Sequence, residues 1–307
     1  MILMKKINIL VVGLLLVFNA QSQNIDKLIK EKEVRRIETI LAADDMQGRR
    51  TFTPGIEKAA AFIADEFKAT GLKTLNNSGS YLQSFAMVRT KFLGTSGTFD
   101  GAALDKKDII VVTTQASISI NETSGFEKIT IGKTANLMSE ARKLAGLKKN
   151  ALVIVDTSFA KTFSGLTRLK SNLFKSDKSV IFVLSATNPT SYSIEAKHEI
   201  TEMPLANVVG VLPGKSRPDE IVIFSGHYDH LGITSKDRNG NVLTDSIFNG
   251  ANDDAAGTTA MMVLAKYFKA LGNNERTLVF AAFTAEEVGG FGATYFSNQL
   301  DPAKVIA

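Results

Sequence analysis

Three clusters of polar side chains, each bordering an apolar run, constrain the fold of residues 221–290 more than any other feature of this sequence. Each cluster lies where a run typical of a strand ends or where a helical pattern begins. In open α/β sheets such positions meet at one edge of the sheet, where ligands bind. Imidazole and carboxylate groups are donors that zinc prefers. The pattern therefore predicts a metal site formed where the three clusters, at 227–230, 250–257 and 286–287, come together.

Taken one at a time, the clusters have simpler explanations. The first would be a hydrogen-bonded histidine–aspartate pair, the second a helix cap and the third a solvated turn. Their coincidence at the ends of elements in one α/β core favours the metal site over these alternatives.

We predict an α/β fold whose central mixed β-sheet is sandwiched by helices. Residues 277–283 are nearly all apolar, as expected for a strand that is covered on both faces. A short turn separates the strand patterns at 206–212 and 221–224, which predicts that these two strands are antiparallel neighbours. Amphipathic helices are expected at 25–43, 55–70, 254–271 and 292–300.

The pattern changes between about residue 90 and residue 200, where short β-branched runs alternate with Gly, Ser and Asn. This segment holds no acid–histidine cluster, and we expect its one histidine, His198, on the surface near a linker. We therefore predict a smaller β-rich inserted domain. The expected divisions are a signal peptide at 1–22, the first part of the main domain at 23–90, the insert at 91–200 and the main core at 201–307.

The first residues are typical of an export signal. Lys5 and Lys6 precede an apolar run at 7–18, and the small residues Ala20 and Ser22 offer a cleavage site. The run is short for an uncleaved membrane anchor, which is the alternative. The absence of cysteine excludes a lipid-anchored cysteine at the new N-terminus, disulfides and thiolate ligands. We expect a secreted or periplasmic protein with no membrane association after cleavage.

Charge and motifs exclude other classes of function. The formal net charge of +5 includes two lysines of the expected signal, and the remaining lysines form no stripe, so no nucleic-acid partner is predicted. The chain has no Gly-x-Ser-x-Gly elbow of a serine hydrolase. The triplets at 132–134 and 214–216 lack the upstream glycine of a phosphate loop.

Three motifs resemble those of one known family. Gly226-His227-Tyr228-Asp229, Gly250-Ala251-Asn252-Asp253-Asp254-Ala255-Ala256-Gly257 and Ala285-Glu286-Glu287 are similar to the motifs of the co-catalytic di-zinc aminopeptidases. That superfamily includes bacterial leucyl aminopeptidase, glutamate carboxypeptidase and the transferrin receptor. Residues 57–63 and 81–85 resemble its N-terminal signature, and the insert lies where many members carry a protease-associated domain.

The resemblance implies a site for two Zn²⁺ ions. His227 would bind one ion and Glu287 the other, with Asp253 bridging the two. It also implies a strained, cis peptide bond between Asp253 and Asp254. The family's next carboxylate ligand and its last histidine would lie beyond the present end of the chain. We therefore expect a C-terminally truncated sequence with an incomplete core.

The resemblance also implies catalytic roles. Glu286 would be the general base that takes a proton from the zinc-bound water. Asp229 would orient His227 by accepting its second ring proton, and His230 would have a supporting role. The implied function is secreted zinc-dependent exopeptidase action on peptides, in the first place release of N-terminal residues. Alternatives are a dipeptidase, a carboxypeptidase, a glutaminyl cyclase or a non-catalytic binding protein; substrate preference and oligomeric state stay open.

Overall fold

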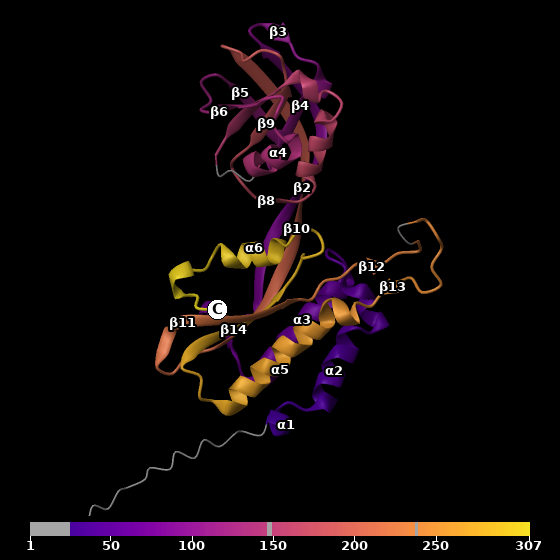
Figure 1. Ribbon diagram of the computed structural model, residues 1–307, viewed down its shortest axis with the longest axis vertical. Coiled ribbons are helices and arrows are strands. Elements are labelled where there is room, and N and C mark those ends of the chain that lie inside the picture. Colours follow the sequence, from indigo (N-terminus) through magenta and orange to yellow (C-terminus); the bar gives the residue numbers. More distant parts are fainter. Residues whose placement is uncertain (1–24, 146–148, 237–238) are drawn as a thin grey trace, which may run out of the picture.

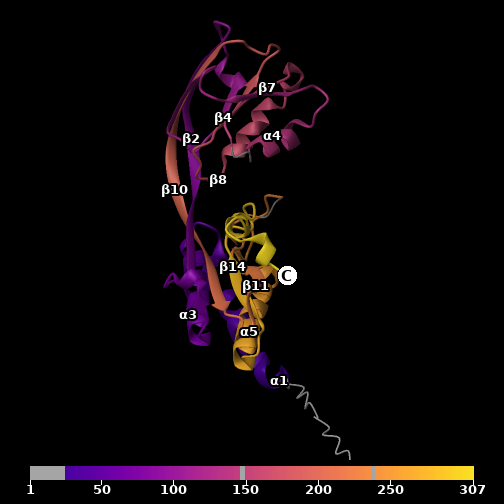
Figure 2. The same ribbon diagram turned by 90° about the vertical axis from the view of Figure 1, so that its left-hand side faces the viewer.

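The computed structural model describes residues 25–145, 149–236 and 239–307, so the expected signal peptide lies outside the described residues. A main body holds the three polar clusters, and the insert lies at the other end of the molecule (Figure 1). Two long strands, β2 (Leu82–Phe99) and β10 (Tyr192–Leu212), run from the body into the insert (Figure 2). No helix among the described residues is both long enough and apolar enough to cross a bilayer.

The main sheet has the order β11 (Arg217–His227), β14 (Arg276–Phe283), β10, β2, β3 (Ala102–Ala103). Strands β1 (Lys73–Thr74) and β5 (Ser117–Asn121) pair with β10, and β8 (Leu173–Phe174) pairs with β2. β11 and β14 are parallel and are connected through helix α5 (Ala256–Leu271), whereas β14 and β10 are antiparallel. The sheet is therefore mixed, as predicted.

The predicted antiparallel pairing of 206–212 with 221–224 is wrong, because β14 lies between β10 and β11. The turn after β10 bonds to the segment that enters β14: the N–H groups of Lys215 and Ser216 donate to the carbonyls of Asn274 and Glu275. The short connection therefore passes over the end of β14, and β11 gains a parallel partner from later in the chain.

Both faces of β14 are buried, because successive apolar side chains point to opposite faces of the sheet. Leu278, Phe280 and Ala282 belong to the core cluster that contains the helices α2 (Glu31–Leu41), α3 (Pro54–Thr70) and α5. The intervening Val279 and Ala281 pack with Phe296 of α6 (Phe291–Ser297) in a separate cluster. Helices thus cover both faces of the sheet, which explains the continuous apolar run.

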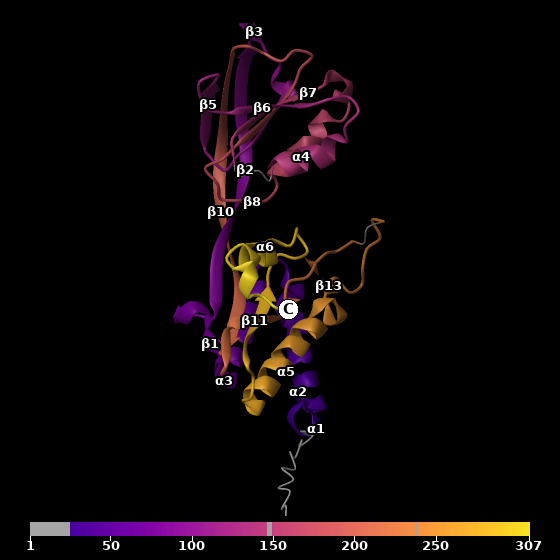
Figure 3. The same ribbon diagram turned by 60° about the vertical axis from the view of Figure 1, so that its left-hand side comes forward.

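The helices begin and end close to the predicted positions. α1 (Ile25–Leu28) and α2 divide the first predicted helix, and α3 ends at Gly71, whose φ of 74° is in the left-handed region that favours glycine. α2 and α5 lie side by side (Figure 3). Short 3₁₀ segments occupy 44–49, 75–77, 106–108, 157–159, 163–170 and 302–304.

The insert has its own four-stranded mixed sheet in the order β4 (Ile109–Val112), β9 (Val180–Leu184), β7 (Ala151–Val155), β6 (Glu127–Ile131). One face of this sheet packs against the β2–β10 ribbon, and the other against α4 (Leu137–Ala145) and the 163–170 segment. The expected boundaries at 91 and 200 fall inside β2 and β10. The insert is therefore joined to the body by a continuous antiparallel ribbon.

The prediction of a surface position for His198 is wrong, because its side chain is buried with only 3% exposed. It pairs across the ribbon with Phe92, whose ring centroid is 5.8 Å away. Neither ring nitrogen has a hydrogen-bond partner among the described residues. Burial, followed by the nearby charge of Lys170, lowers the pKa of His198. No local pattern indicated this burial, because the partner Phe92 comes from the other strand of the ribbon and the Lys170 ammonium lies 5.0 Å from the Phe92 ring.

Candidate metal centre

Parallel pairing brings the first and third polar clusters together. His227, the last residue of β11, is opposite Phe283, the last residue of β14. The Tyr228 N–H donates to the Phe283 carbonyl at 2.9 Å, so the two loops leave the same edge of the sheet in contact. The second cluster lies directly before α5 in the crossover between these strands. This is the edge at which open α/β sheets bind ligands.

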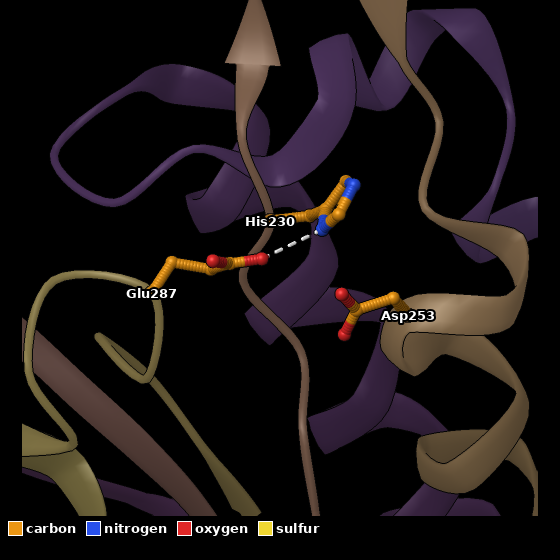
Figure 4. A group of neighbouring side chains, drawn as sticks. All are labelled: His230, Asp253 and Glu287. Atoms are coloured by element: carbon orange, nitrogen blue, oxygen red, sulfur yellow. Dashed lines mark hydrogen bonds and ion pairs between the residues drawn. The ribbon is translucent and has the colours of Figure 1, made fainter.

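Three side chains present one metal-binding atom each within 4.8 Å of one another: His230, Asp253 and Glu287 (Figure 4). The Nδ1 atom of His230 lies 2.9 Å from Oε1 of Glu287. This contact fits the supporting role predicted for His230, and its place in the group also makes it a candidate ligand, which the sequence patterns did not predict. The sequence signal for this role of His230 was the second histidine of the His227-Tyr228-Asp229-His230 segment.

His227 also lies close to Asp253. Its Nε2 atom lies 3.2 Å from Oδ1 of Asp253. Asp253 therefore faces both His227 and the His230–Glu287 pair, and its side chain is 64% exposed, so its oxygens are accessible. The structure thus brings the other two predicted ligands, His227 and Glu287, close to Asp253. Their roles as ligands stay predictions.

Asp229 is fully buried, and its carboxylate holds the third cluster in place. It accepts hydrogen bonds from the N–H groups of Glu286 at 3.0 Å and Glu287 at 3.2 Å, and from the Thr51 hydroxyl at 3.0 Å. The implied role of Asp229 toward His227 stays a prediction: the Nδ1 atom of His227 lies 3.7 Å from this carboxylate and 3.1 Å from the Asp229 carbonyl oxygen. The carboxylate is engaged by the loop that carries Glu286, so the carbonyl is the closer partner of the ring.

The peptide bond between Asp253 and Asp254 is cis, as the family resemblance implied. The Asp254 carboxylate accepts from the N–H groups of His227 at 3.0 Å and Gly257 at 3.1 Å. It therefore ties the end of β11 to the start of α5. This role of Asp254 was not predicted, although the Asp-Asp doublet offered a signal.

The electrostatics of the site favour cations. Burial alone would lower the pKa of His227, but the carboxylates of Asp229, Asp254 and Glu286 raise it to about 9. A ring that holds a proton this firmly lies in a field that also attracts a metal ion. Glu286 itself is exposed, with its backbone fixed by Asp229. Imidazole nitrogens and carboxylate oxygens at these positions form a donor set that fits zinc.

Comparison with known proteins agrees with the motifs. The family model described as Peptidase family M28 matches residues 207–307. The match covers about a third of the chain, and this M28 segment is similar to that family. The resemblance drawn from the three motifs is confirmed for this segment, and the M28 segment contains every candidate ligand and the candidate base.

Individual relatives match this chain over about 100 residues. A probable zinc metalloprotease of Pyricularia oryzae is 36% identical over 101 residues, which are 33% of this chain and 19% of that protein. Aminopeptidase YwaD of Bacillus subtilis is 27% identical over 101 residues, 33% of this chain and 19% of that protein. The chain thus spans about a fifth of the length of these curated relatives.

Among solved structures, an aminopeptidase from Aneurinibacillus sp. strain AM-1 superposes with a TM-score of 0.44 at 15% identity. The superposition covers 91% of this chain and 68% of that one.

Proposed function

We propose that this protein is a zinc-dependent exopeptidase that releases N-terminal residues from peptides. The observation that carries the proposal is the position of Asp253, whose Oδ1 atom lies 3.2 Å from Nε2 of His227 and whose carboxylate also groups with His230 and Glu287 within 4.8 Å. A carboxylate flanked in this way is suited to bridge two cations. The names of the relatives, zinc metalloprotease and aminopeptidase, support the same chemistry.

The residues of the candidate metal centre would have different roles in a metallopeptidase. His227, Asp253 and Glu287 would hold two Zn²⁺ ions, with His230 beside Glu287. Bound zinc supplies Lewis-acid stabilisation of the charge that develops on the substrate carbonyl. Asp229 keeps the backbone of Glu286 and Glu287 in register with the histidine loop through its two carboxylate oxygens.

Glu286 would act as the general base. Its exposed carboxylate extends from a backbone fixed by Asp229, so it is free to accept a proton from the attacking water and to pass it to the leaving amine. A binding protein on the same scaffold has no physical need for this carboxylate. Its presence favours an enzyme over a non-catalytic binder.

The setting of the activity belongs to the same proposal. The N-terminal sequence supports export to a secreted or periplasmic location, where peptides would be the substrates and neither nucleic acid nor membrane a partner. The insert, at 91–200, would act as a protease-associated-like domain beside the peptidase core.

Metal analysis with an aminoacyl-anilide assay tests the proposal. The 307-residue chain should bind zinc supplied in the buffer, release the anilide product and lose this activity with a chelator. An N-terminal glutaminyl substrate would be cyclised rather than hydrolysed by the glutaminyl-cyclase alternative. Zinc retention without turnover of any peptide would favour the binder.

A further inference from the structure

We propose that Arg49 and Thr51, which lie outside the M28 segment, are positioning residues for its metal site. This inference rests on the proposed zinc site. Arg49 is fully buried, and its guanidinium donates four hydrogen bonds to backbone carbonyls. Nε donates to Tyr228 at 2.8 Å, Nη1 to Asn249 at 2.6 Å and also to Leu41, and Nη2 to Gly250 at 3.0 Å.

These acceptors belong to the two loops that carry the candidate ligands. Tyr228 lies between His227 and Asp229, whereas Asn249 and Gly250 lead into the turn that ends on Asp253. One planar group with a fixed fork of donors therefore fixes the spacing of the two loops. The fourth acceptor, Leu41, anchors the assembly to the end of α2.

The backbone around Arg49 adds contacts to the same loops. The His230 N–H donates to the Arg49 carbonyl at 3.2 Å, and the Thr51 hydroxyl donates to the Asp229 carboxylate at 3.0 Å. Thr51 is 5% exposed, so this hydrogen bond is shielded from water. Together the two residues contact the histidine loop, the Asp253 turn and the aspartate that holds Glu286.

The backbone of residues 47–52 adopts conformations that are high in energy for residues other than glycine. Gln47, Arg49 and Phe52 have φ angles of 53°, 49° and 67°, which side chains other than glycine rarely adopt. Such backbone persists only where surrounding contacts determine it, and it clusters at functional sites. Gly48 allows close approach, since a Cβ there would lie 2.6 Å from the carbonyl oxygens of Gly232 and Phe248.

The charge of Arg49 supports a role beyond packing. Burial lowers its pKa, and the negative charges of Asp229, Asp254 and Asp253 oppose that shift. A buried cation is weak evidence for stability, since apolar residues can fill such a volume at least as well. A guanidinium that joins four carbonyls on three segments does something that an apolar side chain cannot: it sets the distance between the loops.

Hydrogen–deuterium exchange of the metal-free chain, with Co²⁺ titration of the same samples, tests the inference. Arg49→Lys keeps the charge but loses the fork. It should speed exchange at 227–230 and 249–255 about tenfold while leaving the insert unchanged, and should weaken Co²⁺ binding about 10- to 100-fold. The neighbouring exposed side chain provides a matched control, Arg50→Lys, which should behave as wild type.

If Arg49→Lys does not fold, two variants of Thr51 test the positioning role instead. Thr51→Val removes the hydroxyl that bonds Asp229 and should speed exchange at 285–287, whereas Thr51→Ser should restore wild-type exchange. Uniform acceleration over the whole chain, or looser loops with unchanged Co²⁺ affinity, would overturn the inference. If the wild-type chain bound no Co²⁺, the proposed function would fail, and the exchange data alone would decide on positioning.

Discussion

The imidazole of His230 hydrogen-bonds the carboxylate of Glu287 at 2.9 Å, although 57 residues separate them in the sequence. This contact joins the loop after β11 to the loop after β14. It exists because the two strands are parallel neighbours that end in register at His227 and Phe283. Asp253 completes the group from the turn before α5 (Figure 4). The consequences can be tested one residue at a time.

Replacing Glu286 by Gln should abolish hydrolysis without loss of metal. The amide cannot accept the proton from water, so kcat should fall about 10²- to 10⁴-fold. Zinc content measured after dialysis should equal that of wild type, because Glu286 is not among the grouped ligands. Glu275→Gln, on an exposed side chain away from the site, is the control. Full activity of the Glu286→Gln variant would refute the general-base role.

Replacing Asp253 by Asn should remove the metal. The neutral amide lacks the charge that balances the cations on both sides, so we expect Zn²⁺ affinity to fall at least about tenfold. Competition with a chromogenic chelator measures this affinity. Asp219→Asn changes a carboxylate that is 91% exposed and far from the site, and it should leave binding intact. Equal affinities in the two variants would contradict the proposed site.

Gly250→Ala should disturb the site through His230. Gly250 has a φ of 60°, and an added Cβ would lie 2.5 Å from the Asp253 carbonyl oxygen and 2.6 Å from the His230 ring. Besides about 1–2 kcal/mol of backbone strain, Co²⁺ binding should weaken at least about tenfold. Gly125→Ala incurs similar strain at a φ of 71° but meets nothing within 4 Å. Co²⁺ titration of both variants separates strain from displacement of the ligand; equal losses would contradict this account.

Glu33 should stabilise the body in a pH-dependent manner. Hydrogen bonds from Arg36 and then Lys266 lower its pKa from 4.5 to about 2. The stabilisation is therefore complete above pH 4.5 and is lost as the pH falls through about 2. Glu33→Gln should lower the free energy of unfolding by about 1 kcal/mol at neutral pH, after allowance for solvent screening. Urea denaturation should show this difference shrinking toward pH 2.

Glu31→Gln is the control for that experiment. Glu31 pairs with Arg35 on the surface, where the two side chains are 83% and 75% exposed, and its replacement should have no measurable effect at any pH. A Glu33→Gln effect that did not change with pH would contradict an electrostatic origin.

His198→Phe should stabilise the insert. Both ring nitrogens lack partners among the described residues, and an apolar ring of similar shape removes that cost of about 1 kcal/mol. The lowered pKa of His198 means that the unfolded chain takes up a proton below pH 6.5 before the folded chain does. Wild-type stability should therefore fall as the pH drops below 6.5 more than that of the variant. Denaturation series at about pH 7 and about pH 5 that run parallel would refute this prediction.

Local patterns in the sequence determined the elements and the chemistry of the site. The continuous apolar run at 277–283, the Gly71 cap and the three polar clusters each depend on neighbouring residues, so they were visible without coordinates. The motifs also identified Asp253 and Glu287 as members of one site. Only tertiary structure decided which strands are neighbours: β14 separates β10 from β11, which a short turn had suggested were paired.

The same distinction explains the residues whose roles were not predicted. Arg49, His198 and the carboxylate of Asp229 take their roles from partners far away in the chain, and no spacing in the sequence encodes such contacts. Pairing register and burial arise when the whole sheet and its covering segments assemble. Sequence therefore supplied the donor groups, and the assembled fold selected which of them face one another.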